Sequence, residues 1–560
     1  MFRLQRFVVL ASLLASGALA LSSQGPTAPL QIVNKEIAPD GYQRNTVLAN
    51  GEYPAPLIKA TKASHRSFED IRDAMKNSII PGRPFPNQRD QLTDRLHRNG
   101  DGYLDSLARS ISTWDQLGRW RFLRHPGQAG TWWYHSHLSA QYCDGLRGPL
   151  VIYDPKDPHA DLYDVDDGLP SILLRERFTE LFYGTLDTTV ITLGDWYHYL
   201  SKDAPPAPQA SSILINGLGR YKMGPTGADA PLAVVGVEQG KRYRFRLVSI
   251  SCDVGVDFSI DQHKMTIIEA DGSNTEPLDV DSVTILTGQR YSVVVAANQP
   301  VDNYWIRAQP ASTAIQGFDG GRNSAILRYR GAPSTDPNTT FVDATSPMVE
   351  TNLHALDNPS APGQHVPGGA DINYTLDVSF SGGSFTVNGT SFEAPSVPVL
   401  LQIMSGAKQP SDLLPKGSIY GLEPNKSVEL VIPGGVLGGP HPVHLHGHSF
   451  SVVRSAGSDS YNWDNPVRRD VVSIGSQDTD RTTIRFFTDN TGPWFLHCHI
   501  DWHLTAGFAV VFAEDVADTA SVSPTPAHFV TDSWNDLCPA YNAAENKAKT
   551  NTAPKKLTLS

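Results

Sequence analysis

The sequence predicts an all-β protein. Its 46 glycines and 41 prolines are spread over a chain of 560 residues. Between them lie short runs rich in Val, Ile, Phe and Tyr, such as 241–250, 291–297 and 428–434. Short runs of this kind between turn residues are typical of strands in β-sandwiches and β-barrels. We see no extended helical periodicity in the regions that flank them.

Composition narrows the possible functions. The chain carries 46 Lys and Arg against 58 Asp and Glu, for a net charge of −12, and it has no basic block. An acidic chain of this kind is a poor binder of nucleic acid. Four cysteines are too few for a disulfide-stabilised scaffold. We therefore expect an ordinary globular protein with no nucleic-acid partner.

The first 20 residues resemble a secretory signal. Arg3 and Arg6 precede a short apolar run, and 18–20 (Ala-Leu-Ala) is a small-residue cleavage site. A membrane anchor is the alternative, but the run is shorter than the ~20 residues of a spanning helix. We expect a secreted, extracellular protein without a membrane partner. Four N-x-S/T triplets then predict glycosylation, at Asn338, Asn373, Asn388 and Asn425.

Histidines gather in three segments, at 135–137, 441–448 and 497–503. Imidazole suits Zn, Cu, Fe and Ni, and a thiolate with two imidazoles is the donor set of blue copper. A lone His-x-His is usually a surface or packing pair, but three such segments together with Cys498 favour metal binding. Structural zinc fits badly, because it takes four ligands in a closed tetrahedron.

Side chains alternate between the two faces of a strand, so the residues of the third segment would fall into two groups. Cys498 would face one way, and His497 and His499 the other. One strand could then serve two metal sites that two peptide linkages join. After a turn, His503 can return to the Cys498 side, and His441 can complete a trigonal site from a distant segment. The pairs His444/His446 and His135/His137 each share a strand face, so a multinuclear cluster is plausible.

Three motifs closely resemble the copper motifs of fungal laccases, which are multicopper oxidases. They are HPVHLHGHSF from 441, WFLHCHIDWHL from 494 and GTWWYHSHLSAQYCDGLRGPL from 130. Six further stretches extend the resemblance over roughly four-fifths of the chain, at 50–58, 191–198, 213–220, 249–253, 287–292 and 534–541. The resemblance implies three consecutive cupredoxin-like Greek-key β-barrel domains. Their expected ranges are 21–155 (with 64–128 aberrant), 156–330 and 331–541, after the signal at 1–20 and before a disordered tail at 542–560.

The resemblance also implies a set of copper ligands. His441, Cys498 and His503 match the type 1 (blue) copper ligands, with Phe508 at the axial position as a non-ligand. The resemblance makes His444 a type 2 ligand. The type 3 pair would take His135, His137, His446, His497 and His499, whereas His448 matches a position that holds no metal. An intact enzyme would hold four copper ions.

The implied reaction is one-electron oxidation of phenols and aryl amines, coupled to four-electron reduction of dioxygen to water. Asp253 matches the acid that contacts phenol, and a carboxylate there can accept the phenol proton. Asp501 is a candidate for relaying protons to oxygen. We expect a monomer. Ferroxidase or ascorbate-oxidase-like chemistry is the alternative, although Phe508 and Asp253 favour the laccase, and a role in lignin degradation, pigment synthesis or detoxification stays open.

The first domain departs from the family. Laccases carry a further motif there, His-Trp-His-Gly, and this chain has none. Two of the eight histidines expected in the oxygen-reducing cluster are therefore missing. Cys143 and Cys252 match a family disulfide, and the family cysteine that would pair with Cys538 is missing too. An inactive copper-binding remnant is thus a further possible function, and the activity of the chain as written is open.

A shift of reading frame would explain this departure. Read one nucleotide later, suitable codons for Ser106–Arg109 encode His-Trp-His-Gly. The same offset over 110–121 gives a sequence that resembles the family's continuation. We hypothesise that residues of about 95–127 are read out of frame in the gene model and that 64–89 are translated intron. The alternative is a truly divergent first domain.

Overall fold

The computed structural model describes most of the chain between residues 30 and 517. The described ranges are 23–24, 30–62, 113–114, 120–121, 128–137, 139–166, 189–221, 230–311, 321–404, 406–407 and 409–517. The expected secretory signal, the expected tail and almost all of the aberrant segment 64–128 therefore lie outside the described residues.

The predicted all-β class is confirmed, since strands make up nearly all of the described elements. The described α-helices are short: α3 spans Val399–Met404 and α4 spans Asp501–Thr505. Within the described ranges, no helix has the length and apolar character that a membrane crossing requires.

The N-terminal sheets are small. A four-stranded sheet has the order β1-β4-β8-β7, and two hairpins, β2-β3 and β5-β6, accompany it. The strands are β1 (Ser23–Gln24), β2 (Ile32–Ile37), β3 (Arg44–Ala49), β4 (Leu57–Thr61), β5 (Thr113–Trp114), β6 (Trp120–Arg121), β7 (Gly130–His135) and β8 (Arg147–Tyr153).

The middle sheets form the largest pair. One has six strands in the order β10-β9-β12-β17-β14-β15, and the other has five in the order β11-β19-β18-β13-β16. Their buried faces share one apolar core. The strands are β9 (Val190–Trp196), β10 (Ser212–Ile215), β11 (Val234–Val237), β12 (Arg242–Ser249), β13 (Val256–Ile260), β14 (Met265–Ala270), β15 (Ser273–Val280), β16 (Val283–Ile285), β17 (Arg290–Ala296), β18 (Asn303–Pro310) and β19 (Ser324–Tyr329).

The C-terminal sheets have five strands each. Their orders are β20-β24-β29-β26-β27 and β23-β31-β30-β25-β28, and the hairpin β21-β22 lies beside them. The strands are β20 (Ile372–Thr375), β21 (Val378–Ser381), β22 (Ser384–Val387), β23 (Ile419–Leu422), β24 (Ser427–Pro433), β25 (Pro442–Leu445), β26 (Phe450–Arg454), β27 (Arg468–Arg469), β28 (Val471–Ser473), β29 (Arg481–Phe487), β30 (Gly492–Cys498) and β31 (Ala509–Glu514).

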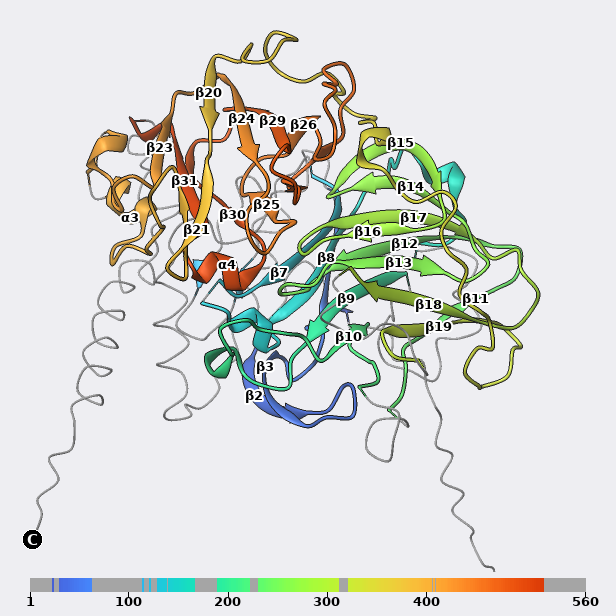
Figure 1. The fold of residues 1–560 in the computed structure, drawn as a ribbon. Coiled ribbons are helices and arrows are strands. Elements are labelled where there is room, and N and C mark those ends of the chain that lie inside the picture. The colour runs from blue at the N-terminus through green and yellow to red at the C-terminus, as the bar shows by residue number, and fades with distance from the viewer. Residues whose placement is uncertain are drawn as a thin grey trace, which may run out of the picture.

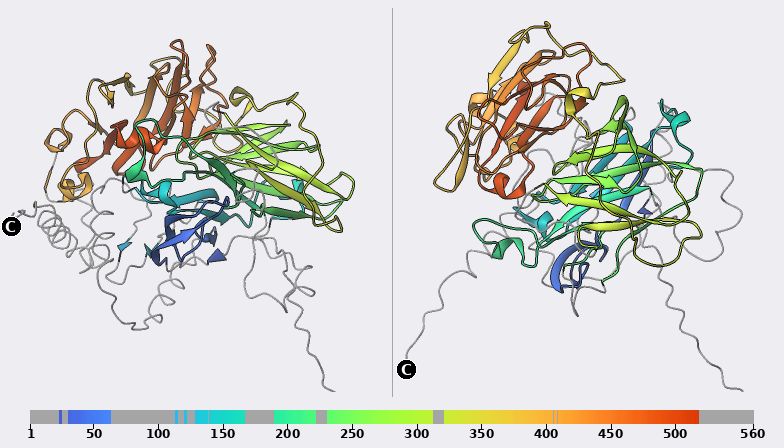
Figure 2. Two further views of the ribbon diagram at one scale, coloured as in Figure 1. Left: turned by 60° about the horizontal axis from the view of Figure 1, so that its bottom comes forward. Right: turned by 45° about the vertical axis from the view of Figure 1, so that its right-hand side comes forward.

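The three groups of sheets meet around β7 and β8. Figures 1 and 2 show the cyan strands β7 and β8 between the green middle sheets and the orange to red C-terminal sheets, with the blue strands β2 and β3 below them. Fully buried ion pairs cross both boundaries, Arg147 to Asp195 at 3.0 Å and Arg290 to Asp470 at 2.6 Å. A buried charge left without its partner costs several kcal/mol, so these pairs favour one arrangement of the sheets.

Candidate metal centre

Three potential ligands converge at one end of the C-terminal sheets. His441 directly precedes β25, Cys498 ends β30, and His503 lies in α4. The antiparallel pairing of β25 with β30 sets Val443 opposite Cys498, which brings His441 to the end of β30. The Nδ1 atoms of the two histidines lie 3.0 Å apart, and they lie 3.5 Å and 3.6 Å from Sγ of Cys498. We call these three residues the sulfur site.

The sulfur site fits a metal ion. A point equidistant from its three donor atoms lies about 2 Å from each, the usual length of a metal–imidazole bond. Burial lowers the pKa of His441 to about 4 and that of His503 to about 3, so both rings are neutral donors near neutral pH. Burial raises the pKa of the Cys498 thiol, so a bound cation is needed to hold the thiolate. One thiolate with two imidazoles suits copper.

Two phenylalanines close the apolar side of the sulfur site. The ring centroid of Phe508 lies 5.3 Å from that of His441, and its carbonyl accepts the backbone N–H of Cys498 at 3.1 Å. Phe385, from β22, lies 4.7 Å from the ring of His503. Neither side chain can ligate. Phe508 was predicted at this place, whereas Phe385 was missed because it lies in a glycine-rich hairpin without a copper motif.

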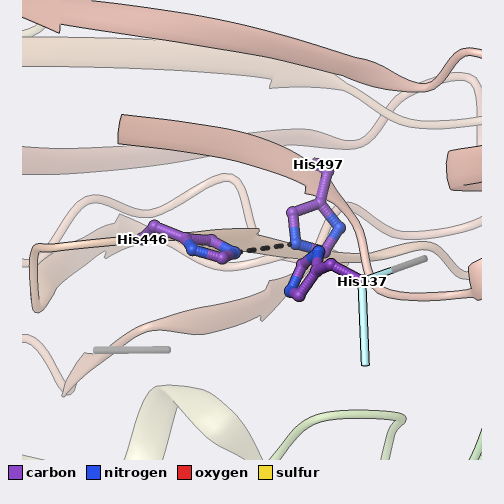
Figure 3. Close-up of side chains that lie close together, drawn as sticks. All are labelled: His137, His446 and His497. Carbon is purple, nitrogen blue, oxygen red and sulfur yellow. Dashed lines mark hydrogen bonds between the residues drawn. The ribbon is translucent and has the colours of Figure 1, made fainter. Parts of the chain in front are cut away.

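A second group of imidazoles lies beyond Cys498. The donor atoms of His137, His446 and His497 all lie within 4.8 Å of one another. Figure 3 shows the three rings pointing toward a common centre, with Nε2 of His446 3.1 Å from Nε2 of His497. His497 and Cys498 are neighbours on β30 and belong to different groups, as strand alternation predicts.

The second group extends to six imidazoles, which we call the imidazole cluster. Its members are His135, His137, His444, His446, His497 and His499. Each ring centroid lies between 4.7 Å and 5.7 Å from those of at least two other members. Two members come from the end of β7 and the residues just after it, and four come from the C-terminal sheets. The structure thus brings together all three histidine segments found in the sequence.

Backbone carbonyls orient several of these rings. Nδ1–H of His444 donates to the carbonyl of Asp470 at 2.8 Å, and Nδ1–H of His497 donates to that of Cys498 at 2.9 Å. A histidine that donates through Nδ1 keeps the Nε2 lone pair for a metal. These two rings are therefore oriented with Nε2 as the nitrogen that can bind a metal ion.

The middle sheets support the imidazole cluster without supplying a histidine to it. Arg290, at the start of β17, binds both carboxylate oxygens of Asp470, at 2.6 Å and 2.7 Å. Its Nε–H donates to the carbonyl of Thr131 on β7 at 3.1 Å. Gly288 lies so close to His499 that a Cβ there would come within 2.5 Å of the ring. The sequence motif at 287–292 does not by itself indicate this role.

Asp253 lies in the loop between β12 and β13. The residue is largely buried, with a small exposed part, and its backbone N–H donates to Oδ2 of Asp195 at 2.8 Å. Burial, together with the negative charge of Asp195, raises the pKa of Asp253 to about 7. The carboxyl group can therefore change protonation state near neutral pH.

Asp501 lies beside the predicted disulfide, which the structure confirms between Cys143 and Cys252. Its Oδ2 is 3.5 Å from Sγ of Cys143, and its N–H donates to the carbonyl of Cys252 at 2.9 Å. Burial, together with the negative charge of Asp144, raises the pKa of Asp501 well above its usual range. The described contacts of Asp501 are thus with the disulfide rather than with a ring of the imidazole cluster. Cys538 lies outside the described residues.

His448 belongs to neither group. Its Nε2 lies 2.9 Å from a carboxylate oxygen of Glu514, and both side chains are buried. The sequence match that set His448 apart from the ligands agrees with this placement.

Known proteins match the chain over almost its full length. Three multicopper oxidase family models match residues 101–157, 187–332 and 392–518. A laccase of Phlebia radiata is 50% identical over 541 residues, which cover 94% of this chain and 96% of that protein. Laccase-5 of Trametes villosa is also 50% identical, with 96% and 98% covered.

Solved structures agree with these relatives. The laccase of Botrytis aclada superposes with a TM-score of 0.68 at 25% identity and covers 97% of this chain and 95% of that chain. Fet3p, described as a multicopper oxidase that functions in iron import, has the same TM-score at 21% identity, covers 93% and 95%, and shows the fold alone. The cupredoxin-like architecture expected from the resemblance is confirmed. Taken with the relatives, these matches show that the chain belongs to the fungal laccases, copper-dependent multicopper oxidases that oxidise phenols with dioxygen.

Proposed function

We propose that this laccase holds type 1 copper at the sulfur site and the copper ions of its oxygen-reducing centre at the imidazole cluster. The observation that carries the proposal is the convergence of the two Nδ1 atoms and the Cys498 thiol around a centre of metal-ion size. Within the imidazole cluster, His444 is assigned to type 2 copper and the other five histidines to the type 3 pair. Bound copper supplies the one-electron redox chemistry.

The chain's own residues connect and serve the two centres. Cys498 is bonded through the backbone to His497 and His499, which gives a covalent path between the sulfur site and the imidazole cluster. Asp253 accepts the proton that a phenol or aryl amine releases on oxidation, because the pKa of Asp253 lies at about 7. Phe508 packs beside His441 and has no donor atom, so it would leave a bound copper ion without a ligand on that side, which would favour a high reduction potential.

The two centres differ in completeness. All three members of the sulfur site are present, whereas the family motif His-Trp-His-Gly is absent from the sequence. We therefore expect the chain as written to bind blue copper and accept electrons from phenols, but to reduce oxygen at a negligible rate. An intact reading frame would restore the missing ligands and full laccase activity.

The cellular setting is part of the same proposal. The signal-like segment 1–20 supports secretion, and all four predicted glycosylation sites, Asn338, Asn373, Asn388 and Asn425, are exposed. We propose an extracellular monomer that acts on small phenols and aryl amines, with no membrane or nucleic-acid partner.

Two experiments test the proposal. Sequencing the transcript across the codons of residues 60–130 should recover His-Trp-His-Gly and the missing cysteine. If the transcript confirms the residues as written, copper analysis of the secreted protein should show a blue site with a deficient oxygen-reducing centre. Full phenol oxidase activity of the chain as written would contradict this account, and oxidation of Fe(II) in preference to phenol would favour a ferroxidase.

A further inference from the structure

A buried carboxylate lies beneath the loop that carries Asp253. Asp195, near the end of β9, has no exposed surface, and its two oxygens accept three successive backbone N–H groups. Oδ1 accepts from Cys252 at 2.8 Å, and Oδ2 accepts from Asp253 at 2.8 Å and from Val254 at 3.3 Å. Three bonds from one side chain fix the backbone of the loop on both sides of Asp253.

The same carboxylate is tied to the N-terminal sheets. Arg147, at the start of β8, donates from Nη1 to Oδ1 of Asp195 at 3.0 Å, and neither side chain is exposed. Nη1 also donates to the carbonyl of Ile250 at 2.5 Å, just before the loop. A charge-assisted bond in a buried site is stronger than a neutral one and leaves little freedom of orientation. The buried Asp195–Arg147 pair therefore forms a rigid support for the loop of Asp253.

Two contacts connect this support and the loop with α4, which carries His503. The hydroxyl of Tyr197 donates to Oδ2 of Asp195 at 2.9 Å, and Nε1–H of Trp502 reaches that hydroxyl at 3.4 Å. The carbonyl of Cys252 accepts the N–H of Asp501, the first residue of α4. The position of the loop is thus coupled to that of the helix.

We propose that Asp195 is a positioning residue for phenol oxidation, because its bonds to the loop hold the Asp253 carboxylate at a fixed place relative to His503. The inference rests on the proposed role of Asp253 as the proton acceptor. Reaction rates fall steeply when a reacting group is displaced by about 1 Å, so a loop anchor acts on the chemistry without touching the substrate.

The variant Asp195→Asn tests the anchor. An amide keeps the shape of the side chain, but its NH2 group would point at hydrogen-bond donors in either orientation, at Arg147 and Cys252 or at Asp253 and Val254. We expect the loop amides at 252–254 to exchange hydrogen at least about tenfold faster than in the unaltered protein. This readout needs neither copper nor activity.

The chemical readout is anaerobic reduction of the blue copper. With a phenol as donor, the rate in Asp195→Asn should fall about tenfold, because proton acceptance by Asp253 is disturbed. With ferrocyanide, which releases no proton, the rate should change less than about twofold. The matched control is Asp261→Asn, which removes a buried carboxylate paired with Arg307 at the far end of β13 and should leave both rates unchanged.

Several results would overturn the proposal. One is hydrogen exchange of amides 252–254 that is no faster in Asp195→Asn than in the unaltered protein. Another is a rate of reduction by phenol that does not fall in this variant, or that falls no more than the rate with ferrocyanide. A parallel Asp253→Asn variant separates the positioning role of Asp195 from the proton-acceptor role of Asp253. If the rate of reduction by phenol is unchanged in Asp253→Asn, the proposed role of Asp253 is wrong. If Asp195→Asn does not fold, hydrogen exchange of the unaltered protein still tests the proposal. Its amides 252–254 must exchange at least about tenfold more slowly than those of the exposed segment 341–344. Equal exchange would refute the anchor.

Discussion

The sulfur site and the imidazole cluster differ in how much of the chain builds each. The sulfur site is formed within the C-terminal sheets, from the ends of two paired strands and one helix. The imidazole cluster draws on β7 as well and is supported by Arg290 from the middle sheets. We therefore expect a fault in the N-terminal part to damage the cluster more than the sulfur site, although both centres share β30.

The largest expected effect comes from the thiolate. Cys498→Ser removes the sulfur donor, so the intense visible absorption of the copper–thiolate bond should disappear entirely. Phenol oxidation should be lost with it. Absorption spectroscopy on the copper-reconstituted variant checks this, with bound copper per chain measured in parallel. A blue variant would show that Cys498 is not the ligand.

Removing one ring of the cluster should separate the two centres. In His446→Ala, we expect the blue absorption and its bleaching by phenol to persist, whereas copper binding at the imidazole cluster weakens. The matched control is His448→Gln, two residues away, which alters a buried histidine outside both groups. Copper analysis and anaerobic spectra give the two readouts. Loss of the blue band in His446→Ala alone would contradict the separation.

Arg290→Lys tests the support given by the middle sheets. Lysine keeps the charge but cannot bind both oxygens of Asp470, so His444 loses part of its fixed orientation. Loss of such an outer partner typically costs 10–100-fold in metal affinity. Copper titration should show a weakening of about tenfold at the imidazole cluster and an unchanged sulfur site. Equal weakening at both sites would indicate a general loss of stability.

The last expected effect is a change in the pH dependence of phenol oxidation. Because the pKa of Asp253 is raised to about 7, its carboxyl is mostly protonated in acid and can accept a proton only as the pH approaches 7. Phenol-driven reduction of the blue copper should therefore rise with pH up to about 7. Asp253→Asn should remove this rise and slow the reaction roughly tenfold near pH 7. Stopped-flow spectra at several pH values test it, and an unaltered profile would exclude Asp253 as the proton acceptor.

Local spacing suggested how the histidines near Cys498 divide into two groups, whereas the full ligand set was predicted from the resemblance to laccases. Alternation along one strand separates Cys498 from His497 and His499, and the structure places them accordingly. The all-β class followed in the same way from short apolar runs between glycines and prolines.

Contacts between distant segments could not be predicted from the sequence. Phe385 reaches His503 from a hairpin more than a hundred residues away, and Asp195 reaches Asp253 from another strand of the middle sheets. Arg290 and Asp470 are separated by 180 residues. No periodicity links such pairs, because their meeting depends on how the sheets pack. The departure of 64–128 from the family stays a prediction from the sequence, because almost all of that segment lies outside the described residues.

The most direct test of the account is a two-step experiment on the chain as written. The copper-loaded protein is bleached with phenol in the absence of oxygen, and oxygen is then admitted while the blue absorption is followed. The account predicts rapid bleaching and negligible recovery, because the sulfur site is complete and the imidazole cluster lacks family ligands. Rapid return of the blue colour would contradict it.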